Sequence, residues 1–92
     1  MEYEWDPDKA KSNFDKHRIS FTAAATALRD PNKIEDLDED HGEERNQVLC
    51  MHPKGLVLFV VTTELDPNVG RIISARRANR NEQERYFKAR SL

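Results

Sequence analysis

Hydrophobic residues near the start of the chain recur at the spacing of an α-helix. Asp6 followed by Pro7 is a typical helix start, because Asp caps free backbone N–H groups and proline is tolerated in the first turn. The sequence therefore predicts a helix from Pro7 to His17, with Ala10, Phe14 and His17 on its apolar face. We expect Phe14 to pack this helix against the core, so that Phe14→Ala costs about 3–5 kcal/mol if the ring is fully enclosed.

A short strand and a second helix flank this segment. Residues 3–5 alternate apolar and polar side chains, as a strand does. Ser20 is a second capping residue, and the residues after it place Phe21 and Leu28 on one face of a short helix. Asp30-Pro31 ends that helix, because proline disfavours helical backbone in the residue before it.

Strand patterns dominate the middle of the chain. The mostly acidic residues 30–44 predict a loop with one short edge strand, and residues 45–51 predict a strand after it. Residues 56–61 are apolar on both faces and rich in β-branched side chains, so they predict the central strand of a sheet. Turn residues separate them from a strand at residues 71–76, and an antiparallel meander is the simplest connection.

The end of the chain predicts a weakly held helix. Asn79 and Glu82 have the spacing of a capping box, and residues 79–90 have only Tyr86 and Phe87 as large apolar side chains. The predicted order is one strand, two helices, three or four antiparallel strands and a last helix, or β-α-α-β-β-β-α in its shortest form. The fold class is α+β with a small antiparallel sheet, and 92 residues predict a single domain over residues 1–92.

Charge is distributed unevenly along the chain. Residues 30–44 carry eight acidic side chains and one basic one, whereas residues 71–92 carry seven basic and two acidic ones. The basic end suits a polyanion or an acidic protein, although a net charge of −2 is not that of a general nucleic-acid binder. Membrane-span and signal-peptide patterns are absent, and one cysteine with three scattered histidines gives no metal-site spacing. We therefore expect a cytoplasmic protein without membrane contact, metal or cofactor.

Arginines bracket the strand predicted at residues 71–76. Strict alternation divides the strand into two faces, with Arg71, Ile73, Ala75 and Arg77 on one and Ile72, Ser74 and Arg76 on the other. Guanidinium groups match phosphate oxygens and stay charged, so these arginines could hold an RNA backbone or stabilise a transition state. Salt bridges to the acidic segment explain the same pattern equally well.

Lys16-His17 is a second candidate, at the end of the first predicted helix. A histidine beside a cation is the usual acid or base in ribonuclease chemistry. Because His17 also falls on the apolar face of its helix, a packed and hydrogen-bonded histidine is the alternative.

Two further residues, Glu44 and Trp5, have two interpretations each. Glu44, followed by Arg45, could act as a base toward a ribose 2′-hydroxyl or pair with Arg76 or Arg77. Trp5 could stack on a nucleobase, or it could cover the edge of the core.

Several segments together resemble a known family. They are Tyr3-Glu4-Trp5-Asp6-Pro7-Asp8-Lys9-Ala10, Lys16-His17, Ile19-Ser20-Phe21, Glu44-Arg45 and Arg71-Ile72-Ile73-Ser74-Ala75-Arg76-Arg77-Ala78 with Glu82 and Tyr86. In this order they are similar to a BrnT-type toxin of a type II toxin–antitoxin pair. The resemblance implies a RelE-like ribonuclease fold, RNA cleavage that arrests translation, and neutralisation by a BrnA-type antitoxin. That antitoxin binds DNA, so operator DNA would be contacted only through it.

The resemblance also implies site residues. The implied catalytic residues are Glu44, Arg71, Arg76 and His17, and the implied RNA-binding residues are Trp5, Lys9, Lys16, Arg45, Ser74 and Arg77. They describe a metal-independent endoribonuclease without cofactors.

Three positions depart from the family pattern. Arg18 and Cys50 stand where glycine is usual, and Leu65 stands where an arginine is often found. These departures support an alternative function, that of a catalytically silent protein that binds an antitoxin or regulates through nucleic-acid binding.

Overall fold

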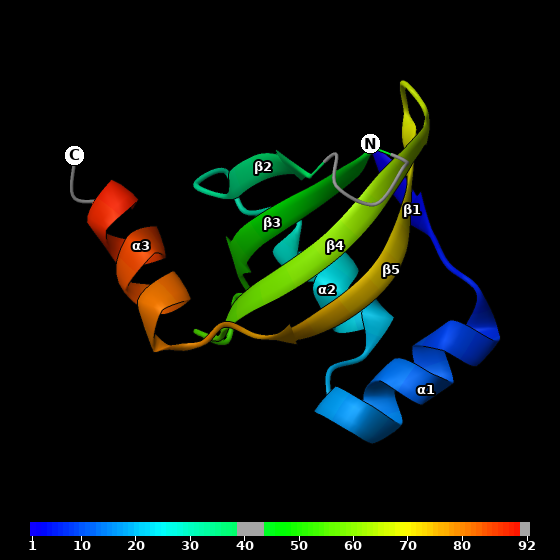
Figure 1. Cartoon of the computed structure of the whole chain (residues 1–92), viewed down its shortest axis with the longest axis horizontal. Helices are drawn as coiled ribbons and strands as arrows, with labels where there is room; N and C mark the ends of the chain where they lie inside the picture. The colour runs from blue at the N-terminus through cyan, green and yellow to red at the C-terminus, as the bar shows by residue number, and fades with distance from the viewer. Residues whose placement is uncertain (39–43, 91–92) are drawn as a thin grey trace.

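The computed structural model describes residues 1–38 and 44–90, which form an α+β arrangement of one sheet and flanking helices (Figure 1). In chain order the elements are β1 (Glu2–Glu4), α1 (Pro7–His17), α2 (Phe21–Ala27), β2 (Ile34–Asp38), β3 (Arg45–Met51), β4 (Val57–Asp66), β5 (Val69–Arg77) and α3 (Arg80–Arg90). The predicted helices and strands are confirmed, including the short strand in the acidic segment. None of the helices in these residues has the length and hydrophobicity that crossing a membrane requires.

Local sequence signals account for the helix starts. The Asp6 carboxylate accepts the backbone N–H two residues further on at 3.1 Å, and the Ser20 hydroxyl accepts the one three residues further on at 3.0 Å. Asn79 and Glu82 exchange side-chain to backbone hydrogen bonds of 2.8 and 2.9 Å, which is the predicted capping box.

The sheet has the strand order β1-β5-β4-β3-β2. Strands β2 to β5 form the predicted antiparallel meander, with β4 in the centre. β1 instead pairs with β5 in parallel, with Glu4 opposite Arg71, so the sheet is mixed. A three-residue strand carries no pattern that specifies its partner, and the two helices between β1 and β2 allow the parallel arrangement. Because β1 reaches only Val69 to Arg71, the remainder of that edge of β5 is open to other partners.

Successive side chains of β3 and β4 point to opposite faces of the sheet, so the core has two layers. Val48 and Val60 belong to the cluster that packs against α2, where Phe21 is 1% exposed. Leu49 belongs to the cluster on the other face, which contains Tyr86 of α3. In Figure 1, α2 lies behind the sheet and α3 lies beyond its β2 side. Trp5 packs edge to face on Phe21 with ring centroids 6.1 Å apart, so it covers the edge of the core.

An irregularity in β5 corrects the predicted division of its residues into two faces. Val61 is opposite Ser74, whereas the next residue, Thr62, is opposite Ile72, so Ile73 is an extra residue on the β5 side. Ile72 and Ala75 consequently share the cluster against α2, although strict alternation places them on opposite faces. The prediction was wrong because a bulge depends on how two strands meet.

The orientation of α1 differs from the prediction because Asn13, not Phe14, faces the sheet. The side-chain amide of Asn13 donates to the Ala75 carbonyl at 2.8 Å and accepts the Ala75 N–H at 3.1 Å. It also donates to the Ile19 carbonyl at 3.1 Å. Asn13 therefore occupies the open edge of β5 as a neighbouring strand would. Phe14 is left 39% exposed, so its predicted burial is wrong. Full enclosure of the ring, the condition for the large cost of Phe14→Ala, is therefore not met.

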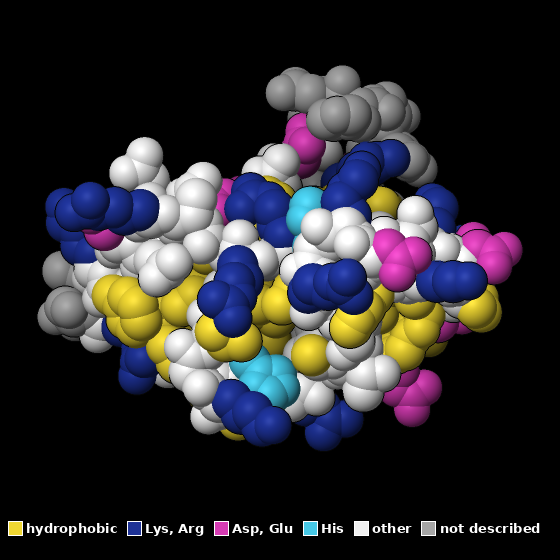
Figure 2. Space-filling view, turned by 90° about the horizontal axis from the view of Figure 1, so that it is seen from below, with side chains coloured by type: hydrophobic (Ala, Val, Ile, Leu, Met, Phe, Trp, Pro, Cys, Tyr) yellow, Lys and Arg dark blue, Asp and Glu magenta, His cyan; other side chains and the backbone are white. Residues whose placement is uncertain are grey.

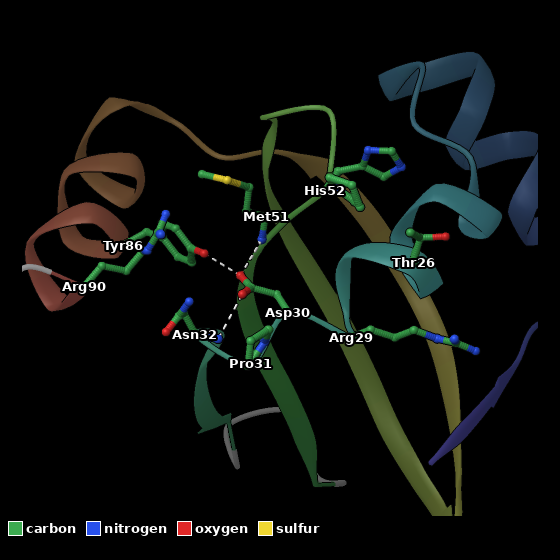
Figure 3. Close-up of a pocket in the computed structure, with 10 residues that line it drawn as sticks. Thr26, Arg29, Asp30, Pro31, Asn32, Met51, His52, Tyr86 and Arg90 are labelled. Atoms are coloured by element: carbon green, nitrogen blue, oxygen red, sulfur yellow. Dashed lines mark hydrogen bonds between the residues drawn. The ribbon is translucent and has the colours of Figure 1, made fainter.

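A half-buried carboxylate connects α3 to the rest of the fold (Figure 3). The Tyr86 hydroxyl donates a short hydrogen bond to Asp30, which also accepts the N–H groups of Met51 and Asn32, each at 2.9 Å. Burial raises the pKa of Asp30, but these hydrogen bonds outweigh it and keep the pKa below its ordinary value. Burial and the bond to Asp30 raise the pKa of Tyr86 to about 12.

Tyr86→Phe should lower the free energy of unfolding by about 1–3 kcal/mol at pH 7, because it removes one hydrogen bond to the half-buried carboxylate of Asp30. The folded-state pKa of Asp30 is lowered, so its stabilisation is present above the unfolded-state pKa near 4 and is lost as the pH falls through the folded-state pKa. The difference between the two proteins should therefore shrink below about pH 4, as urea unfolding at several pH values would measure. An undiminished difference at the lowest pH would assign the effect to ring packing instead.

Candidate functional site

A pocket of about 220 Å³ lies where α1 crosses the open edge of β5. Its lining comprises Lys9, Ser12, Asn13, Lys16, His17, Ile73 and Ser74. Four of these residues, Lys9, Lys16, His17 and Ser74, were predicted site residues. The structure thus brings together a basic helix face and a strand hydroxyl from distant parts of the sequence.

Asn13 explains how α1 presents this face. Lys9, Asn13 and Lys16 follow helical spacing and lie on one side of the helix, and His17 is one turn after Asn13. Because Asn13 is fixed to Ala75, the neighbouring basic side chains are held beside β5. Polar residues one helical turn apart could have indicated which face of α1 lies against the sheet. The sequence interpretation instead placed Phe14 on that face.

His17 is exposed and lines the pocket, so the interpretation of a packed, core histidine is wrong. The helix ends directly after it, at Arg18, whose backbone is left-handed with φ of 59° and whose N–H donates to the Phe14 carbonyl at 2.8 Å. Arginine therefore occupies a position that glycine normally fills, and it does so with the usual helix-ending hydrogen bond.

Arg76 is held by partners within the fold. Its guanidinium donates two hydrogen bonds to Glu82 of 2.8 and 2.9 Å, and it lies over the Phe59 ring at 4.3 Å from the centroid. The hydrogen bond from Arg76 lowers the pKa of Glu82. Since Glu82 also closes the capping box, one carboxylate holds both Arg76 and the start of α3. The capping box was visible in the sequence, but its contact with Arg76 was not.

The other arginines of β5 are more accessible. Arg71 donates to Glu4 of β1 at 2.9 Å with about half of its side chain exposed, and Arg77 is exposed opposite Leu58. Among the described residues, the ion-pair partners of Arg71 and Arg76 therefore come from β1 and α3 and not from the acidic segment. The part of that segment at residues 39–43 lies outside the described residues.

Glu44 lies at a different place, exposed just before β3. It lines a separate pocket of about 370 Å³ together with Leu65 and the acidic residues Glu64 and Asp66. Arg45 is half-buried and opposite Asp38 in the β2–β3 register. The predicted pairing of Glu44 with Arg76 is wrong, because Arg76 pairs with Glu82.

Comparison with known proteins decides the family. The family model described as ribonuclease toxin, BrnT, of type II toxin-antitoxin system matches residues 5–82. The chain belongs to the BrnT family. The matched span contains all the predicted site residues, and the resemblance seen in the sequence is confirmed. Membership in a type II family implies an antitoxin partner.

A solved BrnT structure has the same fold. The crystal structure of the Brucella abortus ribonuclease toxin, BrnT, superposes with a TM-score of 0.65, covering 87% of this chain and 99% of that one. The two sequences are 18% identical, so this likeness supports the α+β fold and not the roles of single residues. No curated protein matches this chain.

The structure locates two departures from the BrnT pattern. Cys50 is buried in the core, and burial raises the pKa of its thiol to about 12, so it acts as a small apolar side chain. Leu65 is 50% exposed near Glu44, away from the lining of the α1–β5 pocket.

Proposed function

We propose that the chain is an endoribonuclease whose active site is the pocket between α1 and β5. The observation that supports this proposal is the convergence of Lys9, Lys16, His17 and Ser74 on one open pocket. A histidine beside two cations and a hydroxyl provides a proton-transfer group and anion-binding groups, which is what cleavage of a phosphodiester requires.

The reaction begins at the ribose. The neutral imidazole of His17 accepts the proton of a 2′-hydroxyl, whose oxygen attacks the adjacent phosphorus. The bond between phosphorus and the 5′-oxygen of the next nucleoside breaks, and that oxygen takes up the proton that His17 received, so the imidazole is neutral again. The product ends in a cyclic 2′,3′-phosphate. Lys9 and Lys16 stabilise the charge that develops on the phosphoryl oxygens, and Ser74 donates a hydrogen bond to one of them. These groups carry the reaction without a metal ion.

The arginines have separate roles in this proposal. Arg71 and Arg77 lie three residues to either side of Ser74 on β5 and bind the RNA backbone beyond the reacting phosphate. Arg76 positions α3 through Glu82. Glu44 lies outside the reacting groups, because it lines a different pocket.

Cleavage by the purified protein tests the activity. We expect labelled single-stranded RNA to yield fragments with cyclic 2′,3′-phosphate ends, with the same rate in excess EDTA as in magnesium. The control RNA carries 2′-O-methyl groups, which cannot attack, and should stay intact. Cleavage that needs magnesium, or that continues on the methylated RNA, would contradict the proposed chemistry.

In the cell, RNA cleavage by this chain would arrest translation, and a BrnA-type antitoxin would neutralise it. The chain would then contact operator DNA only through that antitoxin. The alternative is a catalytically silent binding protein. A folded and antitoxin-binding chain that leaves RNA intact under every condition above would favour that alternative.

A further inference from the structure

A second pocket lies on the other side of the last turn of α1, between α2 and the β3–β4 turn. It has a volume of about 270 Å³ and an apolar floor that includes Ile19 and Leu58, with the half-exposed Phe14 ring as one wall. Figure 2 views this side of the molecule directly and shows a band of hydrophobic side chains with Lys and Arg side chains around it. Neither the proposed reaction nor the packing of the core uses this pocket.

The rim of the pocket is basic. Arg18 and Lys54 line it, and among the residues that the structure describes no carboxylate does. His52 is also on the rim, where its Nδ1 accepts the Lys54 N–H at 3.1 Å, which leaves its Nε2 as a hydrogen-bond donor. The rim thus offers two permanent cations and a donor to any occupant, and it offers no negative charge.

Arg18 holds its place at a conformational cost. A non-glycine residue in the left-handed region is conformationally strained, and strained residues concentrate at functional sites. The Arg18 guanidinium lies over the Phe14 ring at 5.6 Å from the centroid, at the mouth of the pocket. Glycine would relieve the backbone and would remove this charge.

The geometry points to an anchor site for an acidic protein segment, in which an aliphatic side chain enters the pocket and flanking carboxylates pair with Arg18 and Lys54. The buried floor suits an aliphatic group, since Ile19 and Leu58 form it with apolar side chains. A nucleobase fits less well, because Arg18 already covers a face of the Phe14 ring on which a base would stack.

The position of this pocket gives the segment a function that rests on the proposed ribonuclease activity. Lys16 and His17 line the proposed active site, and Phe14 and Arg18 on the same helix turn line the anchor pocket. An extended chain covers about 3.3–3.6 Å per residue, so a segment held by one side chain reaches Lys16 and His17 within a few residues. An antitoxin that docks here would place its own acids over the cations that bind RNA.

Short synthetic peptides test the chemistry of the site by NMR titration. The probe is an eight-residue peptide with two central leucines among aspartates and glutamates, and it should shift the resonances of Phe14, Ile19 and Leu56. Replacing its leucines by serine should weaken binding about 10- to 100-fold, because the buried aliphatic contact is lost. Replacing its acids by asparagine and glutamine should also weaken binding. Equal binding of all three peptides would overturn the proposal.

Matched variants test the residues. Arg18→Gly with Lys54→Gln should weaken binding about 3- to 10-fold, since each exposed ion pair contributes modestly, and the glycine keeps the backbone unstrained. Lys11→Gln, an exposed change on α1 outside both pockets, should leave binding unchanged. Unchanged binding to the double variant would contradict the proposal.

Two further measurements separate this proposal from the proposed function. The double variant should cleave RNA within about threefold of the parent rate, because neither residue lines the active site, and a complete loss would make the pocket part of the RNA site instead. If the parent binds the peptide but does not cleave RNA, the anchor site is supported and the ribonuclease proposal fails. If hexauridylate shifts the Phe14 and Ile19 resonances and the acidic peptide does not, the anchor site for protein is overturned.

Discussion

His17→Gln should lower the rate of RNA cleavage by about 10²–10⁴-fold while the protein keeps its fold. Glutamine can hydrogen-bond to RNA but cannot accept and return a proton, so the loss separates proton transfer from binding. His17 is exposed, and its replacement leaves the hydrogen bonds of Asn13 to β5 intact. The measurement is single-turnover cleavage of labelled RNA together with the growth of cells that express the variant.

The chain offers a matched histidine as the control for this prediction. His52→Gln makes the same chemical change outside the α1–β5 pocket and should leave cleavage within a few-fold of the parent. Lys16→Gln should reduce cleavage through lost charge stabilisation, while Lys11→Gln should not. Full activity of the His17 variant, combined with loss in Glu44→Gln or Arg71→Ala, would move the catalytic centre to Glu44 or Arg71, which the family resemblance also implies as catalytic.

Local chemistry explains why most of the elements could be predicted. Caps such as Asp6 and Ser20 act on the N–H groups of the next few residues, and a β-branched run such as residues 57–61 has few alternatives to a central strand. The same reasoning failed where contacts are distant in the sequence. The parallel pairing of β1 and the bulge at Ile73 arise only when strands from opposite ends of the chain meet.

The site was predictable in its residue types and not in their grouping. Lys16 and His17 are adjacent in the sequence, but they lie near Ser74 only because α1 packs against β5. The family resemblance implies both Arg76 and Glu44 as catalytic, yet one is bound to Glu82 and the other lines a pocket with Glu64. Charge and spacing indicate which side chains are suited to bind RNA. Whether such a side chain is available depends on whether it already pairs with another residue of the fold.

Asn13→Ala should lower the free energy of unfolding by about 2–5 kcal/mol. It removes three hydrogen bonds and leaves the N–H and carbonyl of Ala75 and the carbonyl of Ile19 without their side-chain partner. Each buried polar group left unpaired costs about 1–3 kcal/mol, and water that enters the open edge of β5 offsets part of this cost. Small domains have total stabilities of about 5–15 kcal/mol, so the loss is a large share.

Two neighbouring substitutions distinguish this prediction from a general loss of helix stability. Ser12→Ala changes an exposed residue of the same helix and should alter stability by less than about 0.5 kcal/mol. Asn13→Asp keeps an acceptor for the Ala75 N–H but brings a carboxylate toward two carbonyl oxygens, so it should be at least as harmful as alanine. Urea unfolding gives the free energies, and hydrogen exchange at Ala75 shows whether the β5 edge has opened.

Asn13→Ala should also lower RNA cleavage, because the hydrogen bonds of Asn13 fix α1 to β5. If the helix is released, Lys9, Lys16 and His17 no longer share a pocket with Ser74, and cleavage should fall even at temperatures where the variant remains folded. The Asn13→Ala protein could instead have a free energy of unfolding within about 0.5 kcal/mol of the parent and cleave RNA at the parent rate. That result would show that helix packing alone positions the site. A folded variant with slow cleavage and rapid exchange at Ala75 would show instead that one buried amide connects the stability of the sheet edge to the geometry of the active site.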